Sequence, residues 1–246
     1  MNIKKHIPNI LTLLNLFCGC IAVVCIFNFK IEWAFFFVSL GIFFDFFDGF
    51  FARKFGVAGP LGVQLDSLAD MVTSGFVPGA MMYSLLHSIE FQIRIATLNP
   101  YNSSEVFLLP FVGFIITLGA CYRLANFNID SRQTDSFIGL PTPANTLFIM
   151  SLPIIIKDFS FPTMAQMVAI KWILVAICIV SAYIMNAEIP LFSLKIKNFS
   201  FAKYKLQIGF LATSVIMIAT LQFLAVPIII ISYVLLSVVN NMLVKK

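Results

Sequence analysis

The sequence predicts an all-α integral membrane protein, folded as a polytopic helical bundle. Hydrophobic residues make up 60% of the 246 residues, charged residues only 11%, and the mean hydropathy is +0.98. These values lie far from the average of soluble globular proteins. Because a membrane-spanning helix needs roughly 20 predominantly apolar residues, each apolar run of about that length is a candidate span.

Eight candidate spans follow one another along the chain. They cover approximately residues 7–29, 32–52, 64–88, 105–126, 140–156, 164–186, 206–223 and 225–242. The first has no small-residue cleavage site, which favours a retained span over a cleaved signal peptide. The fifth is short and flanked by prolines, and almost nothing separates the last two. Six, seven and eight spans therefore all remain open.

Positive charge is distributed unequally between the two sides of the eight-span layout. With the N-terminus in the cytoplasm, the inner side collects Lys4, Lys5, Arg53, Lys54, Arg123, Arg132, Lys195, Lys197, Lys203, Lys205, Lys245 and Lys246, and the outer side holds Lys30, Arg94, Lys157 and Lys171. This bias follows the positive-inside rule. It predicts a multi-pass protein of an inner or plasma membrane with both termini in the cytoplasm. The net charge of +5 then reflects topology and attraction to anionic membrane lipid, and no nucleic-acid binding is expected.

Four of the eleven acidic residues lie close together at the second and third spans: Asp45, Asp48, Asp66 and Asp70. On a helix, residues three or four apart share a face, so each pair points in one direction. The turn over residues 56–60 would fold the two helices back on each other and bring both pairs into one pocket. Asp45 is eight residues from Arg53, or about 12 Å along a helix, so this pocket would open toward the cytoplasmic leaflet.

Four neighbouring carboxylates need compensating positive charge, because like charges suppress each other's ionisation. Two divalent cations would supply it, and an oxygen-only ligand set suits Mg²⁺ or Mn²⁺, with Ca²⁺ possible, better than zinc. The alternative is a set of helix-packing ion pairs or carboxylates facing a water-filled vestibule. Too few cationic residues lie within the spans to pair with four aspartates, so a functional metal site is favoured.

The spacing Asp45-x2-Asp48-Gly49-x2-Ala52-Arg53-x8-Gly62-x3-Asp66-x3-Asp70 resembles the full signature of the CDP-alcohol phosphatidyltransferase family. The resemblance implies that Asp45, Asp48 and Asp66 hold a pair of divalent metals. It implies that Asp70 is the general base and also touches metal. The stretch Pro8-Asn9-x2-Thr12-x2-Asn15-x3-Gly19 resembles the start of the first family helix, although Asn9 could instead cap that helix. The implied contacts to CDP-diacylglycerol are Asn9, Thr12, Gly49, Ala52, Arg53 and Gly62.

A second region bears on the acceptor alcohol. Residues 123–128 and 139–145 flank the inner loop between the fourth and fifth spans, and they resemble the phosphatidylserine synthase branch of the family. This resemblance implies transfer of the phosphatidyl group from CDP-diacylglycerol to L-serine, with Arg123 and Asn126 contacting serine. From the residues alone, Arg123 could instead be an interfacial side chain that snorkels to the membrane surface.

The family resemblance also implies an organisation and two rival functions. A six-helix catalytic domain would occupy residues 1–187, and residues 188–246 would add an inner loop and two C-terminal spans. Family members are homodimers, so a homodimer is expected. The nearest rival is a phosphatidylglycerophosphate synthase, disfavoured because glycerol 3-phosphate calls for more basic residues near the site. The other rival is a divalent-cation transporter, which would show internal repeats.

Overall fold

The computed structural model describes residues 6–97, 108–130, 138–157, 163–192 and 205–244. Within these ranges the regular secondary structure is helical, apart from one isolated bridge between Ile138 and Pro190. The helices are α1 (Ile7–Phe27), α2 (Ile31–Phe55), α3 (Pro60–Asp70), η2 (Met71–Phe76), α4 (Val77–Thr97), η3 (Leu109–Gly113), α5 (Phe114–Ile129), α6 (Thr142–Lys157), α7 (Met164–Asn186), α8 (Lys205–Leu221), η4 (Gln222–Leu224) and α9 (Ala225–Val244). The predicted all-α bundle is confirmed.

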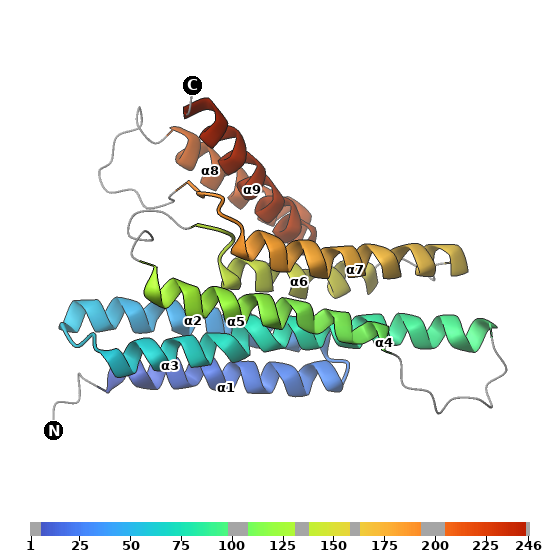
Figure 1. Cartoon of the computed structure of the whole chain (residues 1–246), viewed down its shortest axis with the longest axis horizontal. Coiled ribbons are helices and arrows are strands. Elements are labelled where there is room, and N and C mark those ends of the chain that lie inside the picture. The colour runs from blue at the N-terminus through green and yellow to red at the C-terminus, as the bar shows by residue number, and fades with distance from the viewer. Residues whose placement is uncertain (1–5, 98–107, 131–137, 158–162, 193–204, 245–246) are drawn as a thin grey trace.

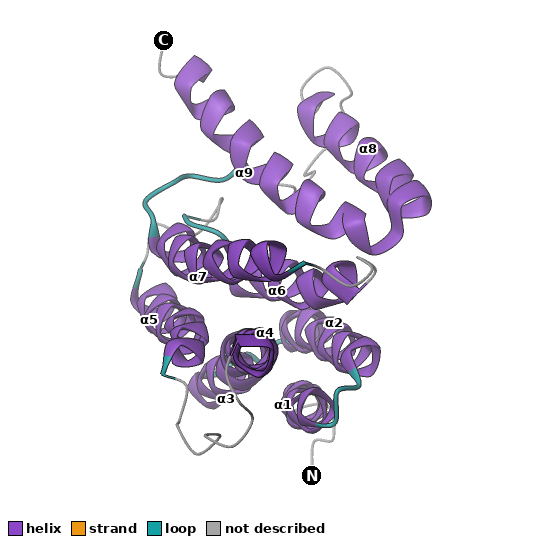
Figure 2. Cartoon of the chain, turned by 90° about the vertical axis from the view of Figure 1, so that its right-hand side faces the viewer, coloured by secondary structure: helices purple, strands orange, loops and turns teal. Residues whose placement is uncertain are grey.

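The helices form three layers. Helices α1 to α5 lie together, α6 and α7 pack on them and run in roughly the same direction, and the α8–α9 hairpin lies on the outer side of α6 and α7 (Figures 1 and 2). One apolar core joins α4, α5, α6 and α7, with Met82, Leu86, Ile116 and Ile149 fully buried. A second core joins α1, α2 and α4 through residues such as Ala22, Val38 and Met81.

Within the described residues, each of the eight predicted spans falls mainly on helix, and residues 105–107 of the fourth lie outside these residues. Five helical stretches of the described residues are long and apolar enough to cross a membrane: Ile7–Phe27, Ile31–Phe55, Leu109–Ile129, Met164–Asn186 and Gln207–Leu243. The last of these contains both helices of the α8–α9 hairpin, and Thr142–Lys157 is apolar but shorter. A multi-pass integral membrane protein follows, and the number of crossings stays a prediction.

Charged side chains lie at both ends of the bundle. Glu32 at the start of α2 pairs with Lys157 at the end of α6, with 2.6 Å between Oε1 and Nζ. Arg53 lies in the last turn of the same helix α2, and therefore at the opposite end. The sequence predicts that Lys157 and Arg53 lie on opposite sides of the membrane, and their positions at opposite ends of the bundle agree with that prediction. Eight of the positive charges counted above lie outside the described residues: Lys4, Lys5, Arg132, Lys195, Lys197, Lys203, Lys245 and Lys246.

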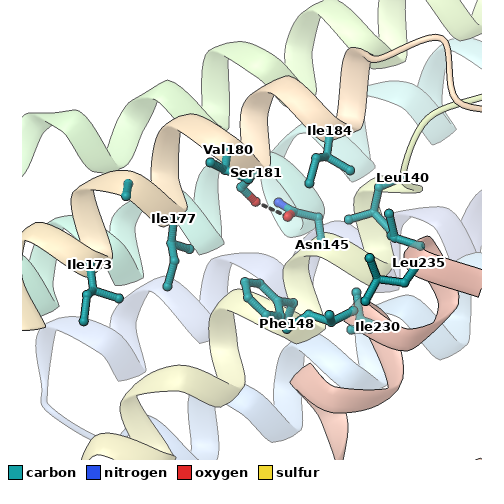
Figure 3. A pocket seen from close by; sticks show the side chains of 13 residues that line it. Leu140, Asn145, Phe148, Ile173, Ile177, Val180, Ser181, Ile184, Ile230 and Leu235 are labelled. Carbon is teal, nitrogen blue, oxygen red and sulfur yellow. Dashed lines mark hydrogen bonds between the residues drawn. The ribbon is translucent and has the colours of Figure 1, made fainter. Parts of the chain in front are cut away.

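A cavity of about 400 Å³ lies between α6, α7 and α9 (Figure 3). Its walls are aliphatic and aromatic, with Ile177 and Val180 on α7, Phe148 on α6 and Ile230 on α9. Its one polar feature is the hydrogen bond from the Ser181 hydroxyl to Oδ1 of Asn145. This cavity shares no lining residue with the acidic pocket of α1, α2 and α3, so the two cavities are separate.

Candidate active site

A tight turn places the two acidic helices beside each other. Helix α2 ends where Gly56 adopts a left-handed backbone (φ 64°), and the Val57 amide donates to the Ala52 carbonyl at 3.0 Å. Glycine is suited to this conformation because it has no Cβ. Pro60 then starts α3, where its fixed φ and missing N–H suit a first helical turn. The predicted helix–turn–helix over residues 45–70 is confirmed.

Three of the four aspartates form one compact cluster. Carboxylate oxygens of Asp45, Asp48 and Asp66 lie within 4.8 Å of one another. Asp48 is buried and the other two are half-buried. The Thr12 hydroxyl of α1 donates a hydrogen bond to Oδ2 of Asp48, which ties the first helix to this cluster.

A pocket of about 400 Å³ opens next to this cluster, between α1, α2 and α3. Asp48 and Asp66 are among its lining residues. All six residues predicted to contact the nucleotide-bearing lipid line it as well: Asn9, Thr12, Gly49, Ala52, Arg53 and Gly62. The structure thus gathers residues from three helices around one space, and their roles stay predictions.

Small residues leave space in this pocket, and the side chain of Arg53 forms part of its lining. A Cβ added at Gly49 would lie 3.3 Å from Nη1 of Arg53, so the guanidinium is folded over the glycine. The Arg53 side chain is otherwise exposed. Its planar fork of donors matches the oxygens of a phosphate. At Gly62, an added Cβ would lie 3.8 Å from Oδ1 of Asn9, where α3 approaches α1.

Asp70 lies one turn beyond Asp66, at the last position of α3, and its carboxyl group contacts that of Asp45. Its Oδ1 accepts a hydrogen bond from Nδ2 of Asn15 at 3.1 Å. Immediately after Asp70 the chain widens into the π-helix η2. The hydroxyls of Thr146 on α6 and Thr117 on α5 donate to the Ser74 and Gly75 carbonyls at 2.9 and 3.0 Å, which satisfies backbone groups in this irregular stretch.

The two residues predicted to contact the acceptor are placed differently. Arg123 is buried, and its guanidinium donates to the carbonyls of Met185 (3.1 Å) and Gly139 (3.4 Å). It therefore joins α5 to the loop before α6 and to the end of α7. Asn126 is exposed. Two residues on, Nδ2 of Asn128 donates to the Ser67 hydroxyl at 2.8 Å, which joins the end of α5 to α3 beside Asp66. The serine-binding roles stay predictions.

Asn15 and Thr73 are site residues to which the sequence analysis gave no role. Asn15 donates to Asp70, and the Thr73 hydroxyl donates to the Asn15 carbonyl at 3.1 Å. Both side chains are buried. A signal was present for Asn15: it follows Thr12 by three residues on an otherwise apolar helix, so both share the face directed at the aspartates.

The donor set fits a hard divalent cation. Only carboxylate oxygens converge in the cluster, and oxygen ligands are those that Mg²⁺, Mn²⁺ and Ca²⁺ prefer. The adjoining pocket is large enough for a substrate group and carries an arginine suited to phosphate. Fold and site together define a polytopic helical membrane protein with an acidic site that can hold a metal ion.

The chain belongs to the CDP-alcohol phosphatidyltransferase family. The model of that family matches residues 5–244. This match extends past residue 187, and the predicted division of the chain at that point stays a prediction.

Similar proteins carry serine-related names. The chain is 34% identical over 143 residues to a CDP-diacylglycerol–serine O-phosphatidyltransferase of Bacillus subtilis (strain 168), a match that covers 56% of this chain and 70% of that protein. It is 29% identical over 153 residues to a protein of the same name from Methanocaldococcus jannaschii, and that match covers 62% of this chain and 63% of the relative. An archaetidylserine synthase of Methanothermobacter thermautotrophicus is 28% identical over 159 residues, covering 61% of each. The match thus spans less than two thirds of the two archaeal relatives.

Proposed function

We propose that the protein transfers the phosphatidyl group of CDP-diacylglycerol to the hydroxyl of L-serine, giving phosphatidylserine and CMP. The observation that carries this proposal is that Asp48 and Asp66 belong to the acidic cluster and also line the pocket of α1, α2 and α3. An arginine that can bind phosphate and carboxylates that can bind metal would therefore meet the same substrate. The names of the similar proteins support serine as the acceptor.

Different pocket residues are proposed to contact different parts of CDP-diacylglycerol. Gly49, Ala52 and Gly62 leave room for the cytidine diphosphate to approach the helix backbones, and Arg53 grips a phosphate with two parallel N–H groups. Asn9 and Thr12 face the same space from α1. The diacylglycerol part stays in the surrounding lipid, because the pocket belongs to helices that cross the membrane.

The transfer is a single displacement at phosphorus. The serine hydroxyl oxygen attacks the β-phosphorus of CDP-diacylglycerol, a new P–O bond forms, and the bond from that phosphorus to the CMP oxygen breaks. Asp70 takes the proton of the hydroxyl, and CMP leaves with the bonding electron pair. General-base help of this kind typically contributes about 10²–10⁴-fold in rate. No covalent enzyme intermediate is needed.

Asp45, Asp48 and Asp66 are the proposed ligands of two divalent cations, Mg²⁺ or Mn²⁺ with Ca²⁺ as a further candidate, and Asp70 is a fourth contact. When bound, these cations would polarise the phosphoryl oxygens and stabilise the leaving phosphate. The close approach of the carboxylates supports such a site, because without compensation they would repel one another.

The acceptor side is proposed to lie near the inner end of α5. Arg123 and Asn126 are the candidate contacts to the carboxylate and amine of serine. Arg53 and Lys54 end α2 at the same end of the bundle, and by the positive-inside rule this end faces the cytoplasm. We further propose an inner or plasma membrane location and a homodimer, which crosslinking of the protein in native membranes would test.

The deciding experiment is CMP release by the purified protein in lipid nanodiscs. CDP-diacylglycerol is supplied with L-serine, glycerol 3-phosphate, inositol phosphate or no acceptor, in the presence of Mg²⁺ or Mn²⁺. We expect CMP release with serine and little with the others. A preference for glycerol 3-phosphate would move the protein to the phosphatidylglycerophosphate branch. Uptake of divalent cations by proteoliposomes without CMP release would contradict the transferase function and support a divalent-cation transporter.

A further inference from the structure

Asn15 is a polar residue in the middle of the apolar helix α1. Its side chain is fully buried, and it lies between Leu14 and Leu16 in sequence. A buried amide in a membrane helix is costly unless it finds hydrogen-bond partners. Its Nδ2 finds one in Oδ1 of Asp70, at 3.1 Å on another helix.

The orientation of this amide is determined by its neighbour. A carboxylate has only acceptor oxygens when ionised, so the Asn15 side chain has to present its NH₂ group and not its oxygen to Asp70. Among the residues described by the structure, none donates a hydrogen bond to Oδ1 of Asn15. The contact with Asp70 is therefore the interaction that fixes the amide.

The backbone around Asn15 is held just as closely. The Thr73 hydroxyl of η2 donates to the Asn15 carbonyl at 3.1 Å, three residues after Asp70 in the chain. A Cβ added at Gly41 would approach Oδ1 of Asn15 to 2.9 Å, and one added at Gly19 would approach Oγ1 of Thr73 to 2.6 Å. Close packing at two glycines thus leaves Asn15 and Asp70 little freedom to separate.

We propose that Asn15 is a positioning residue for Asp70. Its NH₂ group donates to Oδ1 and holds the carboxylate in the orientation in which Asp70 receives the proton of the acceptor hydroxyl. The inference rests on the proposed role of Asp70 as general base and adds a residue that acts through it. Asn15 does not line the pocket of α1, α2 and α3, so its loss should change turnover and not donor affinity.

The first test replaces Asn15 with leucine, which has a similar volume and no donor. We expect kcat for CMP release to fall about 10–100-fold, as is typical when a hydrogen-bond partner behind a site residue is removed. The Kd for CDP-diacylglycerol, measured by equilibrium binding, should stay within twofold. Asn15→Val carries the same test where the leucine variant does not accumulate, since it is smaller, uncharged and likewise has no NH₂ group.

The matched control is Asn28→Leu at the far end of the same helix. There Nδ2 donates only to the Val24 carbonyl of its own helix, at 2.8 Å, and the side chain is exposed. We expect wild-type kcat for this variant. An equal loss of kcat in Asn28→Leu, or unchanged kcat in Asn15→Leu, would overturn the inference.

A double-mutant cycle separates this inference from the proposed function. If Asn15 acts only through Asp70, adding Asn15→Leu to Asp70→Asn should lower kcat little further, because residues in contact are not additive. Independent, multiplying losses would show that Asn15 is merely structural. Full turnover by Asp70→Asn alone would instead remove the base from the proposed function, and the positioning role with it.

Discussion

The hydroxyl of Thr12 donates a hydrogen bond to Oδ2 of Asp48, across the gap between α1 and α2. The same hydroxyl oxygen lies 3.1 Å from the Pro8 carbonyl oxygen, one turn earlier in its own helix. Both side chains are buried. The first helix is therefore part of the acidic site, because it holds one of the three clustered carboxylates from behind.

Thr12→Val should weaken the site without unfolding the helix. Valine has nearly the same shape as threonine, but it leaves one oxygen of Asp48 without its donor. We expect the Mg²⁺ concentration for half-maximal activity to rise about 10-fold or more, as for other residues that orient metal ligands. Thr213→Val is the control, because that exposed hydroxyl contacts only carbonyls of its own helix α8. Equal metal dependence of the two variants would contradict the assignment.

Removal of divalent metal should abolish CMP release, and readdition of Mg²⁺ or Mn²⁺ should restore it. Asp45→Asn and Asp66→Asn should each abolish turnover and weaken metal binding, because each removes one of the converging carboxylates. Isothermal titration with Mn²⁺ measures the binding directly. Glu32→Gln is the control: it breaks an exposed ion pair with Lys157, and such pairs contribute little. Undiminished activity of either aspartate variant would rule out the metal site.

The bundle and the acidic pocket were predictable from sequence for separate reasons. Apolar run length decides whether a helix can span a membrane, and this property is local. The pocket was predictable because Asp45 and Asp48, like Asp66 and Asp70, recur at helical spacing around a turn that contains Gly56 and Pro60. Each of these signals needs only neighbouring residues.

Other features depend on contacts between distant segments. The π-helix η2 is accommodated by hydroxyls of Thr117 and Thr146 from two later helices. The buried bonds of Arg123 depend on carbonyls of Gly139 and Met185, a pairing that local spacing does not reveal. The position of Arg123 at a helix end is visible in the sequence, but its backbone partners are not, because they lie 16 and 62 residues away.

Arg53→Lys should mainly weaken donor binding. A lysine ammonium keeps the charge, but it cannot reproduce the two parallel N–H bonds of a guanidinium on a phosphate. We expect the KM for CDP-diacylglycerol to rise about 10-fold, which corresponds to about 1.4 kcal/mol, with a smaller change in kcat. Arg94→Lys, in the last turn of α4 at the other end of the bundle, is the matched control. A loss confined to kcat would place Arg53 at the reacting centre instead.

Gly139→Ala should destabilise the loop that holds Arg123. Gly139 has a φ of 74°, and a Cβ there would lie 2.4 Å from the Met185 carbonyl oxygen. The left-handed backbone alone costs a residue with a side chain about 1–2 kcal/mol, and the clash adds to this. We expect a lower melting temperature in detergent. Gly209→Ala on α8 has open space around its Cβ and should leave the melting temperature unchanged or raise it. A Gly139→Ala protein as stable as wild type would contradict the placement of this loop.

Comparison of Asp70→Asn with Asp45→Asn separates the base from the metal ligands. Asp70 accepts a hydrogen bond from Asn15 and contacts Asp45, whereas Asp45 belongs to the three residues whose carboxylate oxygens lie within 4.8 Å of one another. As a base, Asp70 should contribute about 10²–10⁴-fold in rate, or about 3–5 kcal/mol of barrier. Asp70→Asn should therefore lower kcat by that factor at saturating serine and largely keep its affinity for CDP-diacylglycerol and Mn²⁺. Asp45→Asn should lose metal binding and turnover together. If Asp70→Asn lost metal binding as completely as Asp45→Asn, Asp70 would be a ligand first, and the serine proton would have to pass to water or to the phosphate of the substrate itself.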